Sequence, residues 1–185
     1  RRDHARGRFA RFPSLHVLVL LVLGGLVIGV VAYARDDGTI DGSGNPATVT
    51  RAVPPFSAVD LNGTSAVRIT VGPERSVVVH ADDNLVERVT TEVDAGVLHV
   101  STRGDFSASS PMYVDVSVGS LDAVTLSGTG AITVQGVDAD ALRVELPATG
   151  TGLVTVSGSA QRLTAHLAGT GDLQLAELQA RDAEA

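Results

Sequence analysis

Alternation of apolar and polar positions is the clearest pattern in the chain, and it is strongest between residues 121 and 175. Three segments share one arrangement there: an alternating apolar pair, a corner that contains Gly-Thr-Gly, and a second alternating pair. They are Leu126–Val134, Leu146–Val156 and Leu167–Leu175. A period of two is typical of strands that bury one face and expose the other. The pattern therefore predicts strands joined by tight corners.

The last glycine of each corner recurs at a nearly fixed interval. Gly130, Gly152 and Gly171 are separated by 22 and 19 residues, and a repeat of about twenty residues is typical of solenoids. One such unit cannot offset its own backbone entropy, so the units must stack. We therefore expect an all-β parallel β-solenoid, or β-helix, with a right-handed path. Glycine suits its corners because glycine accepts a positive φ.

An earlier copy of the unit begins far upstream. The segment 56–71 aligns with 121–134, so that Val59 matches Val124 and Gly63 matches Gly128. One domain over residues 53–185 is therefore expected, and its last repeat looks truncated. Between the copies, the sequence predicts a strand meander with a hairpin over 89–100. It also predicts a helical turn over 82–87, capped by Asp82 or Asp83.

An apolar segment precedes this domain. Residues 17–34 carry no charge and would span roughly 27 Å as a helix, which is close to the thickness of a bilayer core. A transmembrane helix over 15–34 is expected, with a signal peptide cleaved after Ala34 as the alternative. The basic segment 1–14 would then stay cytoplasmic, and the rest would lie outside the membrane. Residues 35–52, rich in Gly, Asp and Ser, are expected to form a flexible linker.

The charge distribution excludes one class of partner. The net charge is −7, and residues 1–14 contribute five arginines and one aspartate, so the remainder carries −11. An acidic body is unsuited to nucleic acid, whose affinity depends on neutralised phosphates. There is no Cys or Trp. Disulfides and thiolate metal sites are therefore impossible, and aromatic-lined binding surfaces are not expected.

Several polar residues are candidate metal ligands. His80, His99 and His166 stand alone, without the spacing of a metal pair. The carboxylates of Asp82, Asp83 and Glu87 could share a cation, but the segment lacks the glycine and the regular spacing of oxygen ligands that a calcium loop has. A solvated helix start is the favoured interpretation of these three residues.

Other motifs are incomplete. The segment 169–173 resembles half of a calcium-binding nonapeptide, but the sister corners have Ala131 and Leu153 where Asp172 stands. Phosphate loops and the serine-hydrolase elbow are absent from the sequence. The glycosylation pattern at 62–64 falls on a corner, where a structural explanation is preferred.

A polysaccharide-active β-helix enzyme would need carboxylates or basic groups clustered on one face of the coil, usually with aromatic subsites. The expected outward positions make no such cluster; they are Thr125, Thr133, Glu145, Thr155, His166 and Gln174. The sequence therefore predicts no enzyme, and it assigns no catalytic, cofactor-binding or metal-binding residue.

An ordered set of segments resembles a known family. These segments are 42–45, 56–59, 79–85 and 91–98, followed by the Gly-Thr-Gly corners. Together they are similar to the bacterial head GIN domain family, which is labelled as auto-transporter adhesins. The resemblance covers about residues 42–180, and it implies an extracytoplasmic β-solenoid without catalytic residues. The chain departs from a lipoprotein because no Cys follows its apolar run.

Three functions remain open from the sequence. The first is a non-enzymatic adhesin or envelope-binding module that recognises a protein or glycan of the cell surface or envelope and needs no cofactor. The second is a sensory ectodomain whose cytoplasmic partner would join the basic segment 1–14. The third, a polysaccharide-active enzyme, is the least favoured.

Overall fold

The computed structural model describes residues 22–23, 26–27 and 39–184. The chain divides into two compact units, 1–36 and 37–185. In the first unit, β1 (Val22–Leu23) and β2 (Leu26–Val27) pair antiparallel. The predicted segment 1–14 and most of the predicted helix over 15–34 lie outside the described residues. Within the described part, no helix is long and apolar enough to cross a membrane.

The second unit is built almost entirely of strands. They are β3 (Ile40–Asp41), β4 (Pro46–Thr50), β5 (Ala58–Asn62), β6 (Ala66–Val71), β7 (Ser76–Asp82), β8 (Val89–Asp94), β9 (Val97–Thr102), β10 (Phe106–Ser107), β11 (Tyr113–Val118), β12 (Ala123–Leu126), β13 (Ala131–Leu146), β14 (Leu153–Leu167) and β15 (Asp172–Glu184). The short 3-10 helix η1 (Val86–Arg88) lies between β7 and β8. β3 and β10 form a separate parallel pair, and the other strands make one 11-stranded sheet.

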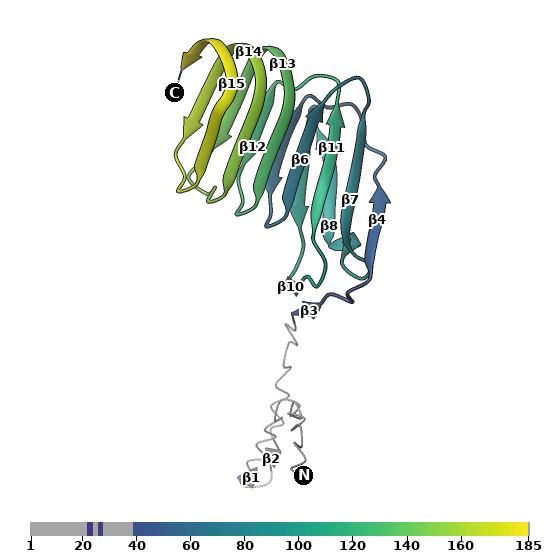
Figure 1. Cartoon of the computed structure of the whole chain (residues 1–185). Coiled ribbons are helices and arrows are strands. Elements are labelled where there is room, and N and C mark those ends of the chain that lie inside the picture. Colours follow the sequence, from purple (N-terminus) through teal and green to yellow (C-terminus); the bar gives the residue numbers. More distant parts are fainter. Residues whose placement is uncertain (1–21, 24–25, 28–38, 185) are drawn as a thin grey trace, which may run out of the picture. The chain divides into compact units, whose positions relative to one another are not determined.

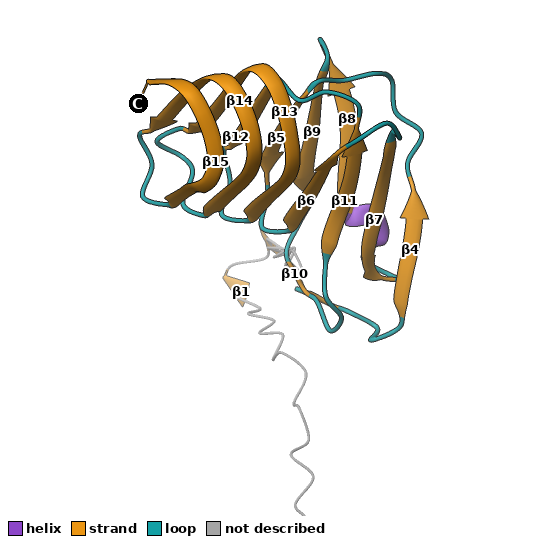
Figure 2. Cartoon of the chain, turned by 45° about the horizontal axis from the view of Figure 1, so that its top comes forward, coloured by secondary structure: helices purple, strands orange, loops and turns teal. Residues whose placement is uncertain are grey.

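That sheet curls over on itself as an open half-barrel (Figures 1 and 2). Its first flank contains β4, β7, β11, β6 and the first halves of β13, β14 and β15. Its second flank contains β8, β9, β5, β12 and the second halves of the same three long strands. The long strands bend from one flank to the other, so the ladder of hydrogen bonds continues through the curl.

The predicted parallel β-solenoid is wrong, although the prediction of an all-β domain holds. A solenoid needs a separate strand on each side of every coil, whereas β13 runs from one flank to the other as a single strand. It absorbs the bend at an irregularity between Val134 and Val137, where Gly136 has a positive φ of 73°. In addition, β4, β7 and β11 pair antiparallel, as do β8 and β9. A parallel solenoid does not contain such pairs.

The internal alignment of the sequence nevertheless matches the strand register. β12 pairs parallel with β5, with Val124 opposite Val59, and β13 pairs parallel with β6, with Ile132 opposite Val67. Ile132 also lies opposite Val154, which in turn lies opposite Leu173. The predicted column of stacked aliphatic residues is therefore confirmed, since equivalent positions of successive repeats lie side by side in neighbouring strands.

The core follows from this alternation. Inward positions of both flanks form one cluster of buried side chains, and the largest fully buried ones are Leu61, Ile69, Leu85, Leu98, Leu121, Leu126, Ile132, Leu142 and Leu146. The predicted hairpin over 89–100 is confirmed as β8 and β9, with Ala95 and Gly96 at positive φ in its turn. Burial of the apolar face of each strand against the opposite flank provides the main stabilisation.

The corner glycines serve a different purpose from the predicted one. Gly130, Gly152 and Gly171 do not adopt a positive φ. Each instead lies against the backbone of the preceding layer, where an added Cβ would overlap a carbonyl oxygen: that of Ser65, Gly130 and Gly152, respectively. The corners therefore need glycine because successive layers approach closely, rather than because the chain turns through a left-handed conformation.

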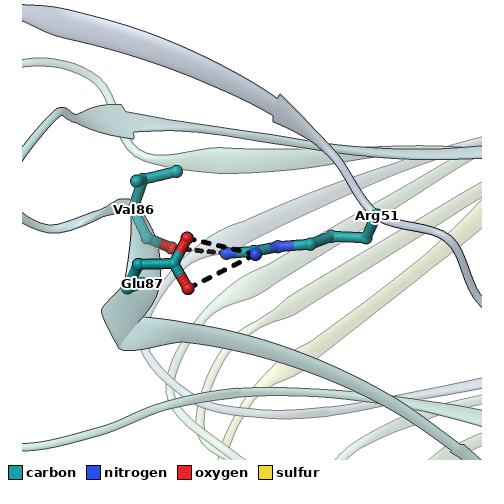
Figure 3. Close-up of polar contacts among 3 residues, drawn as sticks. All are labelled: Arg51, Val86 and Glu87. Atoms are coloured by element: carbon teal, nitrogen blue, oxygen red, sulfur yellow. Dashed lines mark hydrogen bonds and ion pairs between the residues drawn. The ribbon is translucent and has the colours of Figure 1, made fainter.

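Part of the predicted linker is folded. The segment 35–52 contains β3 and β4, and β4 pairs with β7 at the edge of the sheet. The predicted cap of the helical turn is also wrong, since η1 follows Leu85 without a side-chain cap. Arg51, just after β4, holds this turn: its guanidinium donates to the Val86 carbonyl at 3.0 Å and to the Glu87 carboxylate at 3.2 Å (Figure 3).

Candidate functional site

Outward side chains of neighbouring strands line up in rows across both flanks. On the first flank, strand register places in one row Asp115, Arg68, Thr133, Thr155 and Gln174. On the second flank, register places in one row His99, Asp60, Thr125, Glu145 and His166. The six outward positions predicted from sequence thus fall into two rows, three on each flank. The sequence did not predict this arrangement in rows, and only Glu145 and His166 among the six positions are ionisable.

Three planar groups stack beside the first row. The ring of Tyr113 on β11 lies 4.3 Å from the ring of His80 on β7, with an interplanar angle of 13°. The Arg68 guanidinium carbon on β6 lies 4.1 Å from the centroid of the Tyr113 ring. Because β6 and β7 flank β11 on opposite sides, the tyrosine stands between the cation and the imidazole. A cation over an aromatic face is attracted to it.

A hydrogen bond with Thr48 and a close contact with the Asp115 carboxylate hold the His80 ring in this position. Its Nε2 lies 3.1 Å from Oδ2 of Asp115, and its Nδ1 lies 3.2 Å from Oγ1 of Thr48 on β4. Both ring nitrogens therefore have partners, and His80 is not arranged as a metal ligand. We call this set the Tyr113 platform; it consists of Thr48, Arg68, His80, Tyr113 and Asp115.

Sequence reasoning missed the Tyr113 platform. Its residues come from four strands, and the low aromatic content argued against any such surface. Arg68 and Thr48 are exposed, while the other three residues are partly exposed. The only signal in the sequence was that polar residues of β6, β7 and β11 share one parity, which becomes informative only when the pairing of these strands is known.

The second flank holds a smaller polar cluster. The Asp60 carboxylate accepts a hydrogen bond from Ser127 Oγ at 2.9 Å and lies 3.2 Å from Nδ1 of His99. The aspartate stands between the serine and the histidine, so the imidazole does not contact the serine oxygen through these bonds. A serine nucleophile needs the histidine as its base and the aspartate behind it. This cluster therefore lacks the order that activates a serine.

Asp82 is the principal buried charge of the described residues, and it was not predicted as such. Its carboxylate is fully buried. It accepts hydrogen bonds from Ser110 Oγ at 2.6 Å and from the backbone N–H groups of Ser109, Ser110 and Gly44 at 2.8, 3.2 and 3.1 Å. The bond from the Ser110 side chain is the main reason that the pKa of Asp82 lies below its ordinary value, and burial opposes this shift.

Through these contacts Asp82 joins two loops. Gly44 precedes β4, whereas Ser109 and Ser110 precede β11, and Gly42 packs so closely that a Cβ there would overlap the carboxylate.

The three candidate cation ligands, Asp82, Asp83 and Glu87, do not converge on one point. Asp83 accepts from Ser43 Oγ, and Glu87 pairs with Arg51. Because N–H and O–H donors occupy the Asp82 oxygens, its arrangement suits a structural role.

Two shallow hollows follow the bend of the long strands. One, of about 640 Å³, is lined by Asp138, Ala139, Asp140, Ser159, Ala160, Gln161, Gln179, Ala180 and Arg181. The other, of about 600 Å³, shares residues 138–140 and extends to Asp122, Arg143 and Arg162. Their walls are polar, and part of their lining is already paired, since Gln161 donates to Asp140 at 2.8 Å.

The fold and its outer rows define an all-β domain with a curled sheet and an extended polar outer face. The family model described as "putative auto-transporter adhesin, head GIN domain" matches residues 55–185. The chain therefore belongs to the head GIN domain family, as its sequence resemblance predicted. A search of the curated proteins found no match.

Several solved structures share this fold. A putative adhesin of Bacteroides fragilis is 19% identical to this chain, and the two superpose over 78% of this chain and 77% of the adhesin chain with a TM-score of 0.66. A putative adhesin of Parabacteroides merdae is 17% identical, with coverage of 69% and 60% and a TM-score of 0.54. A putative lipid binding protein of Parabacteroides distasonis is 18% identical, with coverage of 78% and 79% and a TM-score of 0.50. At these identities the likeness establishes the fold alone.

Proposed function

We propose that the chain is a non-enzymatic binding module displayed outside the cytoplasmic membrane, and that the Tyr113 platform is its main contact surface. The family's adhesin label supports a role in binding at the cell surface. The observation that carries the proposal is the stack of Arg68, Tyr113 and His80 on the outer face of the first flank. Arginine and tyrosine are the residue types that concentrate binding energy in interfaces.

The chemistry of the Tyr113 platform favours a polar ligand. Arg68 presents a guanidinium with several donors, and the adjoining row adds the hydroxyls of Thr133 and Thr155. Such a surface suits a glycan or a polar protein segment that carries carboxylate or hydroxyl groups. Neither the sensory role nor polysaccharide cleavage is proposed. The former depends on residues 1–14, and the latter would need an activated catalytic pair.

Replacement of Arg68 by alanine is expected to weaken ligand binding at least about tenfold, because it removes the cation and its donors from the Tyr113 platform. The measurement is binding of the purified full chain to an array of cell-envelope polysaccharides and extracellular-matrix proteins, with affinities then determined for each probe that binds. Arg143→Ala is the matched control, since it removes an exposed arginine of β13 that lies on the second flank.

The control should change these affinities less than about threefold, as expected for an arginine away from the contact surface. Equal losses in Arg68→Ala and Arg143→Ala would contradict the assignment to the Tyr113 platform. Failure of the wild-type chain to bind any probe above an empty surface would count against a binding role of this kind.

A further inference from the structure

The corner between β5 and β6 differs in its hydrogen bonds from the three corners that follow it along the chain. In those three corners the first glycine donates its backbone N–H to a carbonyl oxygen at 2.8 to 3.0 Å; these glycines are Gly128, Gly150 and Gly169. Gly63 is the equivalent glycine of the first corner, and within the described part of the chain its N–H has no hydrogen-bond partner. A backbone N–H without a partner can lose its proton to solvent, so the Gly63 nitrogen is a potential nucleophile.

The residue before Gly63 supplies a group that this nitrogen can attack. Asn62 ends β5 and is exposed, and among the described residues its side-chain amide has no hydrogen-bond partner. The equivalent positions of the other corners are Ser127, Thr149 and Ala168, none of which carries an amide. The side-chain carbon Cγ of an asparagine and the backbone nitrogen of the next residue can close a five-membered ring. Glycine hinders this closure least, because it has no Cβ and its backbone rotates most freely.

The other two asparagines of the sequence lack this combination. Asn45 is followed by Pro46, which has no N–H and therefore no nucleophile. The amide of Asn84 is engaged at both ends. Its Oδ1 accepts a hydrogen bond from the backbone N–H of Ser43 at 3.0 Å, and its Nδ2 donates to the backbone carbonyl of Asp41 at 2.9 Å. These bonds must break before the side chain of Asn84 can turn towards its own backbone.

We propose that Asn62 is a site of self-catalysed modification, in which its amide is converted to a carboxylate with water as the only co-reactant. The Gly63 nitrogen gives its proton to solvent and forms a bond with Cγ of Asn62. The bond between Cγ and Nδ2 breaks, and Nδ2 takes up a proton and leaves as ammonia. Water then adds to one of the two carbonyl carbons of the ring and breaks its bond to nitrogen, which gives either aspartate or isoaspartate.

The two products should differ in their effect on the corner. Aspartate leaves the main chain unchanged and adds a negative charge on the same face of β5 as Asp60, since residues two apart in a strand share a face. Isoaspartate carries the main chain through Cβ and lengthens it before Gly63. The next layer leaves no room for this change, because a Cβ on Gly128 would already overlap the backbone nitrogen and oxygen of Gly63. We therefore expect isoaspartate to loosen the corner and aspartate to be tolerated.

The modification does not depend on the proposed binding role, since Asn62 lies on β5 and is not part of the Tyr113 platform. Its test is incubation of the purified full chain at neutral pH over several weeks, followed by digestion with trypsin and mass spectrometry. Cleavage after arginine places the three asparagines in separate peptides, 36–51, 52–68 and 76–88. The peptide 52–68 should gain the mass that accompanies replacement of the amide by a carboxyl group. It should do so at least about tenfold faster than the peptide 76–88, whose asparagine is held by two hydrogen bonds.

The variant Asn62→Gln is the matched control, because its longer side chain cannot close the five-membered ring; its peptide 52–68 should keep its mass. A second control is the synthetic peptide 52–68, which reports the rate without the fold. Three results would overturn the proposal: an intact Asn62 in the folded chain after the synthetic peptide has been converted, equal rates for Asn62 and Asn84, or the same mass gain in Asn62→Gln. Urea unfolding of the aged chain should have a lower midpoint than that of fresh Asn62→Asp, which contains no isoaspartate. Equal midpoints would contradict the effect assigned to the lengthened main chain.

Discussion

Replacement of Gly152 by alanine is expected to lower the free energy of unfolding by about 3 kcal/mol, the upper end of what overpacking usually costs. The added Cβ would overlap the carbonyl oxygen of Gly130 and would lie 2.8 Å from Cδ2 of Leu126. Neither neighbour can retreat easily. The Gly130 oxygen belongs to the preceding layer, and Leu126 is fully buried in the core. Urea unfolding followed by circular dichroism measures the change.

Gly72→Ala is the matched control for this substitution. Gly72 also lies outside the regular strands, but a Cβ there would meet no atom within 4 Å, and its φ is not positive. Alanine at a compatible glycine position should leave the stability unchanged or raise it by up to about 1 kcal/mol, because it restricts the unfolded chain. Equal effects of the two substitutions would show that close approach of the layers does not explain the corner glycines.

Replacement of Asp82 by asparagine is expected to produce the second large loss. The asparagine side chain keeps one acceptor oxygen, but its amide group would face N–H groups that now bind the carboxylate. Buried donors would lose their partners, and the loops before β4 and β11 would lose their common anchor. The midpoint of thermal unfolding at neutral pH should therefore fall several times further than in Asp83→Asn. That control removes an exposed carboxylate with a single hydroxyl partner.

The effect of Asp82 should also depend on pH in one direction. Hydrogen bonding lowers the pKa of the folded-state carboxyl from the ordinary value of 3.8, so the charged form is favoured by folding. Its contribution is present above pH 3.8 and is lost as the pH falls through the lower folded-state pKa. The stability difference between wild type and Asp82→Asn should therefore shrink below pH 3.8. A difference that stays constant or grows there would contradict the role assigned to the carboxylate.

The correct parts of the fold prediction came mainly from the alternation of apolar and polar residues along each strand. The alignment of Val59 with Val124 was made from sequence alone, and these residues prove to be neighbours in adjacent strands. The stacking of Ile132 on Val154 followed from the same periodicity. The prediction of a solenoid failed because the alternation of apolar and polar residues indicates which face of a strand is buried, but it does not indicate where the strand ends. Residues 135–141 carry no corner signal stronger than Gly136, and β13 simply bends there.

The candidate site could not be predicted because it depends on contacts between distant segments. Asp82 looked like a helix cap, since an aspartate shortly before the apolar residues Leu85 and Val86 fits that pattern. Its actual partners, Gly44 and Ser110, are brought to it by pairing of β7 with β4 and β11. Tyr113 likewise gains its significance from Arg68 and His80 on the strands beside it. Sequence parity placed each residue on a face, but only the strand order made them neighbours.

The proposed function depends first on where the curled sheet is displayed. The chain has no cysteine, so a single Thr70→Cys substitution at an exposed position of β6 gives one labelling site on the outer face. The decisive measurement is reaction of this variant with a membrane-impermeant maleimide on intact bacterial cells that produce the full chain. Labelling of intact cells to the same extent as of lysed cells is the predicted result. Labelling only after lysis would contradict the account.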